Sequence, residues 1–139
     1  MTGKALTAAQ TRRIQKAVAT VPYAHLLGIE LDDISQGVAT LGLDVREELK
    51  QNHGVVHGGA IASLIDTAMA FAIITLLEPR EKVTTVDLTI SYLRPLTKGR
   101  ITARARVVRS GRRLFVVSAD VFSDDGILAS TALSTYIKV

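Results

Sequence analysis

The chain has 139 residues, 47% of them hydrophobic and 22% charged, which fits a single folded domain over residues 1–139 and excludes a disordered chain. It has no cysteine, which excludes disulfides, thiolate catalysis and cysteine-based zinc sites. Aromatic residues make up 4% and Trp is absent, so we expect no nucleic-acid partner that binds by base stacking. The formal net charge of +4 suits an anionic ligand but also lies within ordinary variation.

The first residues predict a short helix over about 7–20. Thr7, with Gln10 three positions later, has the pattern of a capping box, and an apolar stripe follows before Pro22 ends the helix. This segment is basic and lacks the apolar run of a secretory signal. Together with the absence of cysteine, it leads us to expect a cytoplasmic protein.

Residues 29–34 and 39–45 are predicted strands, joined by Ser35-Gln36-Gly37 into a hairpin. A long helix is predicted over about 60–77, where Pro79 stops it, and because it is apolar on nearly every side we expect it to be buried. Its length would allow a membrane span. Asp66 near the hydrocarbon centre would cost roughly 2.5–3.5 kcal/mol, however, so no span is expected.

Four further strands follow without another helix. In the first of them, alternation places Val86, Leu88 and Ile90 on one face and the intervening polar residues on the other. Strands that pair in sequence around one long helix predict an α+β domain, an antiparallel sheet wrapped around a central helix. The predicted strand ranges are 83–92, 100–109, 113–122 and 127–139.

The segment around the start of the long helix resembles the hotdog-fold thioesterases, in particular the PaaI-like and 4-hydroxybenzoyl-CoA thioesterase group. The resemblance rests on His57-Gly58-Gly59, on Asp66 nine positions after His57, and on residues 84–88 and 92–95. It extends over roughly residues 22–139. It implies a hotdog fold and hydrolysis of an acyl- or aryl-CoA thioester without metal or cofactor, CoA being part of the substrate. It also implies a homodimer that assembles into a homotetramer.

Gly58 and Gly59 open the helix without side chains that would obstruct their N–H groups, at the end where the helix carries partial positive charge. A thioester carbonyl could accept from the Gly58 N–H and be polarised in the transition state. The alternative is that both glycines only allow close packing.

Asp66 is a carboxylate in an apolar helix, and such a group is usually paired or functional. The resemblance implies that it acts as nucleophile or as general base on water, and the sequence does not choose between these roles. The structural alternative is a salt bridge or a cap to a neighbouring helix.

The resemblance gives three further residues a place in the reaction. It implies that Gln51 orients the carbonyl or the water and that Thr85 positions the water, although Thr84 is adjacent to Thr85 and threonine is common in strands. His57 is expected to hold the loop by hydrogen bonding rather than to act as a base. His53 and His57 could suggest a metal pair, but the residues between them do not build a helix face and no third ligand is near, so no metal is expected.

No acidic residue occurs between Leu88 and Ala119, whereas basic residues are frequent there. CoA carries a pyrophosphate and a ribose phosphate, which such residues would bind. The alternative is a solvated strand face, because Arg100, Arg104 and Arg106 share one side. The residues expected to bind CoA are Gly59, Arg94, Lys98, Arg109, Ser110, Gly111, Arg112 and Arg113.

Two alternative functions are a non-catalytic acyl-CoA sensor and a hotdog dehydratase or hydratase. A sensor that regulates genes would need a DNA-binding module, and one short N-terminal helix is too little for it. A dehydratase would need a differently placed His. Because Gly58 and Asp66 lie roughly 10–12 Å apart along one helix, we expect a monomer to be incomplete and the site to be shared across a two-fold interface.

Overall fold

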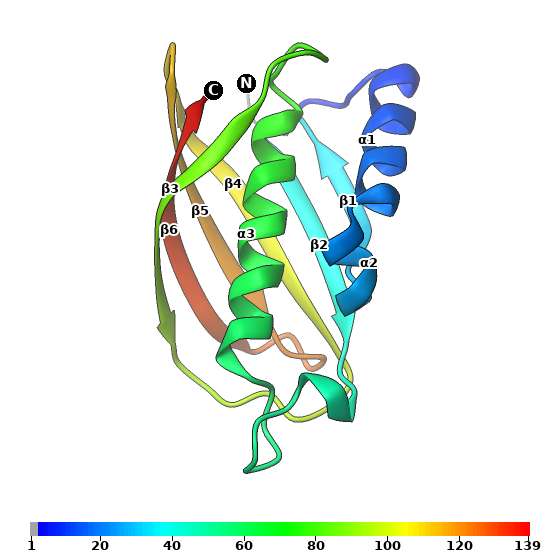
Figure 1. Cartoon of the computed structure of the whole chain (residues 1–139), viewed down its shortest axis with the longest axis vertical. Coiled ribbons are helices and arrows are strands. Elements are labelled where there is room, and N and C mark those ends of the chain that lie inside the picture. Colours follow the sequence, from blue (N-terminus) through cyan, green and yellow to red (C-terminus); the bar gives the residue numbers. More distant parts are fainter. Residues whose placement is uncertain (1–2) are drawn as a thin grey trace.

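The computed structural model describes residues 3–139, in which three α-helices and one 3-10 turn accompany six strands (Figure 1). The predicted α+β class is confirmed, because the long helix α3 lies against one face of an antiparallel sheet. In chain order the elements are α1 (Ala8–Thr20), α2 (Pro22–Leu27), β1 (Glu30–Ser35), β2 (Val38–Asp44), the 3-10 turn (Glu47–Leu49), α3 (Gly58–Ile74), β3 (Val83–Tyr92), β4 (Arg100–Ser110), β5 (Leu114–Phe122) and β6 (Leu128–Lys138).

The N-terminal helix begins with the predicted capping box. The Gln10 N–H donates to Thr7 Oγ1 at 3.1 Å, and the Thr7 N–H donates to Gln10 Oε1 at 2.9 Å. A second short helix, α2, was not predicted. It begins at Pro22, a residue that fits the first helical position because the N–H it lacks would have no partner there.

The long helix α3 begins two residues before its predicted start and ends three residues before its predicted end. It begins early because His57 Nδ1 accepts the Gly59 N–H at 2.8 Å and so caps the helix. At the other end, the Thr75 hydroxyl donates to Ala72 O and accepts the Gly37 N–H, which ties the helix to the β1–β2 turn. In residues 3–139 no helix is long and apolar enough to cross a membrane.

The sheet has the order β1-β2-β4-β5-β6-β3, with antiparallel pairs throughout. Pairing strictly in sequence was therefore wrong for one strand. β3 pairs with the last strand, β6, and lies at the edge of the sheet, while β2 pairs directly with β4. The ten-residue strand β3 thus leaves one backbone edge without a partner strand within the described residues.

The core lies between α3 and the inner face of the sheet. Leu64, Ile65 and Met69 of α3 are fully buried, together with apolar residues of β2, β4 and β5 such as Leu41 and Val117. The prediction that the helix is enclosed on every side was wrong, because one stripe of α3 is only half-buried. This stripe includes Ala62, Ser63, Asp66, Thr67 and Ala70.

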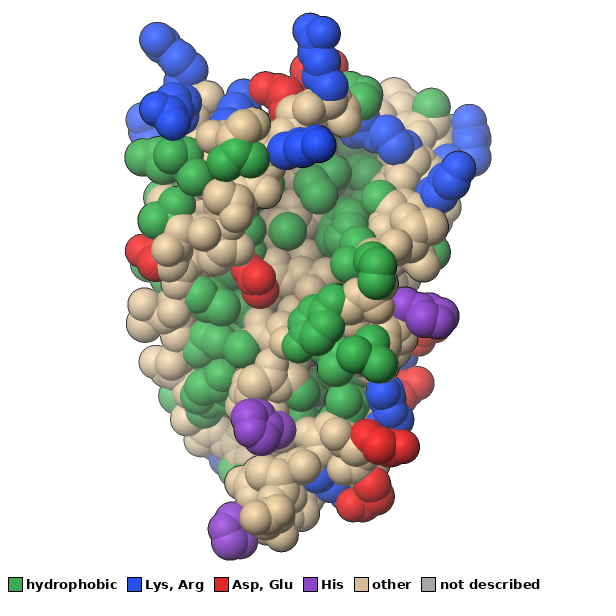
Figure 2. All heavy atoms as spheres, in the orientation of Figure 1, with side chains coloured by type: hydrophobic (Ala, Val, Ile, Leu, Met, Phe, Trp, Pro, Cys, Tyr) green, Lys and Arg blue, Asp and Glu red, His purple; other side chains and the backbone are tan. Residues whose placement is uncertain are grey.

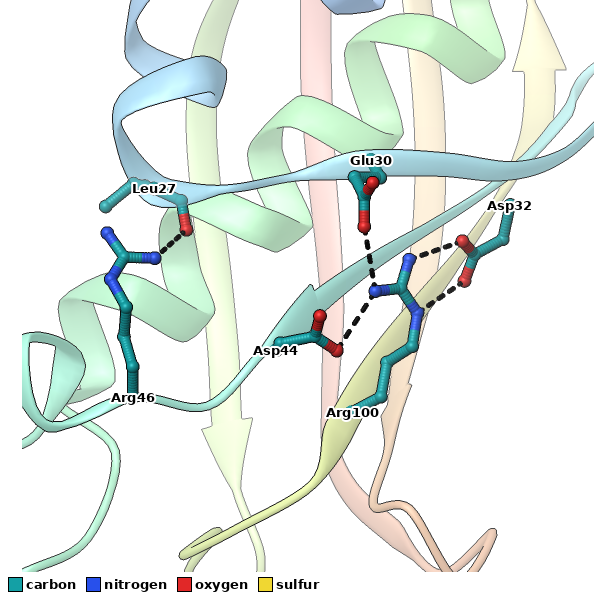
Figure 3. Close-up of polar contacts among 6 residues, drawn as sticks. All are labelled: Leu27, Glu30, Asp32, Asp44, Arg46 and Arg100. Atoms are coloured by element: carbon teal, nitrogen blue, oxygen red, sulfur yellow. Dashed lines mark hydrogen bonds and ion pairs between the residues drawn. The ribbon is translucent and has the colours of Figure 1, made fainter.

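One edge of the sheet is fixed by an arginine among three carboxylates (Figure 3). Arg100 of β4 bonds Glu30 at 3.0 Å and Asp32 at 2.6 Å on β1, and Asp44 at 3.1 Å on β2. The hydrogen bonds that Arg100 donates to Asp32 contribute most to raising the pKa of Arg100. Gly42 leaves room for this cluster, since a Cβ there would lie 2.5 Å from Arg100 Nη2. Arg100 therefore ties three strands together.

Candidate functional site

The Asp66 carboxylate is held by hydroxyl groups from two adjacent strands. Thr85 of β3 donates to Asp66 Oδ1 at 2.9 Å. Tyr136 of β6 donates to the same oxygen, and its hydroxyl also lies 2.8 Å from the Asp66 backbone carbonyl oxygen. The salt bridge considered as an alternative for Asp66 does not occur among residues 3–139. The half-buried carboxylate is hydrogen-bonded but carries no counter-charge.

A β-bulge brings Thr85 to this position. The register of β3 against β6 shifts between Thr85 and Asp87, so Val86 is an extra residue. Thr85 therefore lies on the helix side of the sheet with Leu88 and Ile90, and the predicted simple alternation along this strand was wrong. Val86, expected on the same face as Leu88 and Ile90, is 55% exposed.

Tyr136 was not predicted as a site residue. Its side chain is 1% exposed, and burial first, then the hydrogen bond to Asp66, raises the pKa of its phenol above the ordinary value. The group therefore remains a protonated donor at neutral pH. A buried tyrosine usually needs a hydrogen-bond partner for its hydroxyl, which is the only signal the sequence offered.

The N-terminus of α3 presents a free backbone donor. The Gly59 N–H is used by His57, as the sequence predicted for the role of this histidine, whereas the Gly58 N–H has no acceptor within residues 3–139. The Tyr92 hydroxyl donates to Gly58 O at 2.9 Å. A Cβ on Gly58 would lie 3.3 Å from the Tyr92 ring, so a larger residue here would press on that ring.

A depression of about 270 Å³ opens beside this free donor. Gly58 and Ile61 of α3 form one wall, and Tyr92 with the segment that follows β3 forms the other. Burial raises the pKa of Tyr92, so its hydroxyl remains a donor to the Gly58 carbonyl. The depression can admit a small group to the Gly58 N–H.

The other expected site residues are divided between the two ends of the molecule. Arg94 and Lys98 line a second depression of about 340 Å³, which adjoins the first through Arg94, Pro95 and Leu96. Residues 109–113 lie at the far end of β4, an 11-residue strand that is roughly 35 Å long. Lys and Arg side chains gather at that end, over the end of α3 (Figure 2). A single copy of the chain does not bring these two groups together.

Gln51 lies in the exposed loop before α3, where its Oε1 accepts the His53 N–H at 2.8 Å. It has no hydrogen bond to Asp66. No group of three His, Asp or Glu side chains in the described part of the chain is arranged to hold a metal ion. The site consists of a backbone donor at the helix start and, a little over two turns further along, a carboxylate without a cation.

The model of the Thioesterase superfamily matches residues 53–130. A medium/long-chain acyl-CoA thioesterase, YigI of Salmonella typhimurium, is 26% identical over 149 residues, which cover 95% of this chain and 96% of YigI. A thioesterase family protein from Silicibacter pomeroyi is 28% identical, with a TM-score of 0.88 over 94% of this chain and 98% of that chain. The E. coli PaaI protein from the phenylacetic acid degradation operon has a TM-score of 0.87 at 23% identity, over 95% of both chains. The predicted hotdog fold is confirmed.

Proposed function

Because this chain belongs to the Thioesterase superfamily and is a thioester hydrolase, we propose that it hydrolyses acyl-CoA thioesters to a free acid and CoA. The observation that supports this most is the pairing of a free N–H at Gly58 with the hydroxyl-held carboxylate of Asp66 on one helix. CoA enters as part of the substrate, and no cofactor or metal takes part. The protein acts in the cytoplasm, as its composition predicts.

The reaction needs a polarised carbonyl and an activated oxygen nucleophile. The Gly58 N–H donates to the thioester oxygen, and the positive end of α3 stabilises the negative charge that develops there. Asp66 either takes the proton of the attacking water or attacks the carbonyl carbon itself to give an acyl-enzyme that water then hydrolyses. In both cases a C–O bond forms, the C–S bond breaks and the CoA sulfur leaves as the thiol.

We propose that the working unit is a homodimer, which pairs further into a homotetramer. Gly58 and Asp66 are eight residues apart on α3, so about 12 Å along the axis, which is too far for both to touch one thioester carbon. A two-fold axis that pairs the free β3 edges would let Gly58 of one subunit face Asp66 of its partner.

The CoA nucleotide is proposed to lie over Arg94 and Lys98, because their depression continues from the one at Gly58. Residues 109–113 can reach the same nucleotide only from the partner subunit, since they lie at the opposite end of β4. His57 keeps the α3 N-terminus in place, and Gln51 lies in the loop before it.

A thiol-release assay over aromatic and aliphatic acyl-CoAs tests this function. The chain has no cysteine, so the protein itself adds no thiol to the signal. We expect turnover of at least one acyl-CoA and the loss of most of that turnover in the Asp66→Asn variant. Acyl-CoA binding without thiol release across the panel would instead identify a sensor, and hydration of an enoyl-CoA without thiol release would identify a hydratase.

A second prediction distinguishes Thr85 from its neighbour Thr84. Thr85→Ala removes a hydrogen bond to the carboxylate, so kcat should fall by roughly 10-fold or more, a typical loss for a group that orients a catalytic residue. Thr84→Ala is the matched control on the same strand, since Thr84 makes no side-chain hydrogen bond to Asp66. Steady-state kinetics of both variants decide the matter, and equal losses would contradict the assignment.

A further inference from the structure

We propose that Tyr136 is a positioning residue: together with Thr85 it occupies Asp66 Oδ1 and thereby leaves Oδ2 as the reacting oxygen of the carboxylate. This inference rests on the proposed function, since it says which atom of Asp66 meets the water or the thioester. Tyr136 belongs to the last strand. It is not part of the motif at the start of α3, and no sequence spacing links it to that motif.

The two carboxylate oxygens of Asp66 have different surroundings. Oδ1 accepts from two hydroxyl groups, Thr85 at 2.9 Å and Tyr136, which fill both of its lone-pair directions. Oδ2 has no hydrogen-bond partner in residues 3–139. It is also not sealed in the core, because the only buried side-chain oxygen without a partner in this part of the chain is Ser130 Oγ.

Tyr136 is well suited to hold the carboxylate in one orientation. Its ring is fixed in the core at 1% exposure, whereas Asp66 stands on a half-buried stripe of α3. Two donors from β3 and β6 fix the carboxylate plane against the sheet, so Oδ2 points to the open side. Holding a reacting atom within a narrow range of positions and orientations raises the reaction rate by orders of magnitude.

Both hydroxyl groups that face the carboxylate of Asp66 donate to the same oxygen atom. Facing the carboxylate, β3 contributes Thr85 and β6 contributes Tyr136, neither of which carries charge. Asp87, the nearest other acid on β3, uses its carboxylate to accept the Thr135 N–H. The faces of β2, β4 and β5 that pack on α3 are apolar. Tyr136 and Thr85 are thus the groups that compensate the charge of Asp66.

The test is Tyr136→Phe, which keeps the ring and removes only the hydroxyl. We expect kcat to fall roughly 10- to 100-fold with KM changed by less than about 3-fold, because Asp66 stays but loses its orientation. Tyr23→Phe is the matched control: its hydroxyl contacts Ser63 and not Asp66, and its side chain is 54% exposed.

A second measurement does not depend on activity. The carboxyl carbon resonance of Asp66 in the ligand-free protein should shift in Tyr136→Phe and not in Tyr23→Phe. An unchanged kcat and an unchanged resonance in folded Tyr136→Phe would overturn the inference, as would a loss confined to KM. Wild-type protein that releases no thiol from any acyl-CoA would instead overturn the proposed function, even with the resonance shift present.

Discussion

Asp66→Asn is expected to lower kcat by roughly 10²–10⁴-fold, the usual contribution of a general base. The amide matches the carboxylate in size and still accepts hydrogen bonds from Thr85 and Tyr136 through its oxygen, so neither a cavity nor an unpaired hydroxyl is created. It can neither take a proton from water nor attack as an anion. Steady-state thiol release measures the loss.

The control for this prediction is that folding and binding persist. The thermal midpoint should stay within a few degrees of the wild-type value, and calorimetry with a non-hydrolysable acyl-CoA analogue should give an affinity within about 3-fold. Wild-type rates in the variant would show that Asp66 has only a structural role.

The second large effect is expected for Gly58→Val, with a fall in kcat/KM of roughly 100-fold or more, the range seen when one oxyanion donor is lost. A Cβ at this position would lie 3.3 Å from the Tyr92 ring, and the further methyl groups would enter the depression next to the Gly58 N–H. The thioester oxygen would be kept from its donor. Kinetics with the best acyl-CoA of the panel measure the loss.

Gly58→Ala provides a graded comparison. Its single methyl group would be accommodated if Tyr92 moved by a few tenths of an ångström. The kcat/KM of Gly58→Ala should therefore lie between that of the wild-type protein and that of Gly58→Val. If valine were tolerated with wild-type kinetics, the carbonyl would not bind at the Gly58 N–H.

Local signals in the sequence were sufficient for most of the fold. Thr7 with Gln10 predicted the α1 cap, and the Ser35–Gly37 turn predicted the first hairpin, because each depends on residues a few positions apart. The place of β3 could not be predicted in this way. Its partner β6 lies far along the chain, and sheet order depends on how the strands pack around α3.

The part of the candidate site that belongs to a sequence motif could be predicted. The part that only the tertiary structure brings together was missed. Asp66 in an apolar helix is visible as an anomaly in the sequence. Tyr136 is 70 residues away from it, and no spacing rule links them. The β3 bulge was missed for a related reason: strict alternation assigns Thr85 to the outer face, and only the extra residue Val86 reverses that assignment.

In the proposed dimer, one active site takes Gly58 from one subunit and Asp66 from its partner. Both residues lie on the same helix, about 12 Å apart. A mixed dimer therefore distinguishes this shared arrangement from a site formed within one subunit. Each subunit of a mixed dimer of Asp66→Asn and Gly58→Val would carry one lesion. If the sites are shared, both substitutions lie in the same active site, and the second active site of the mixed dimer is intact.

The decisive measurement is thiol release after the two inactive variants are dissociated, mixed in equal amounts and re-associated. Random pairing makes about half of the dimers mixed, each with one intact site of two, so activity should return to about one quarter of the wild-type value per subunit. Native mass spectrometry verifies that mixed dimers have formed. Activity that stays at the level of the parent variants, with mixed dimers present, would contradict the shared site.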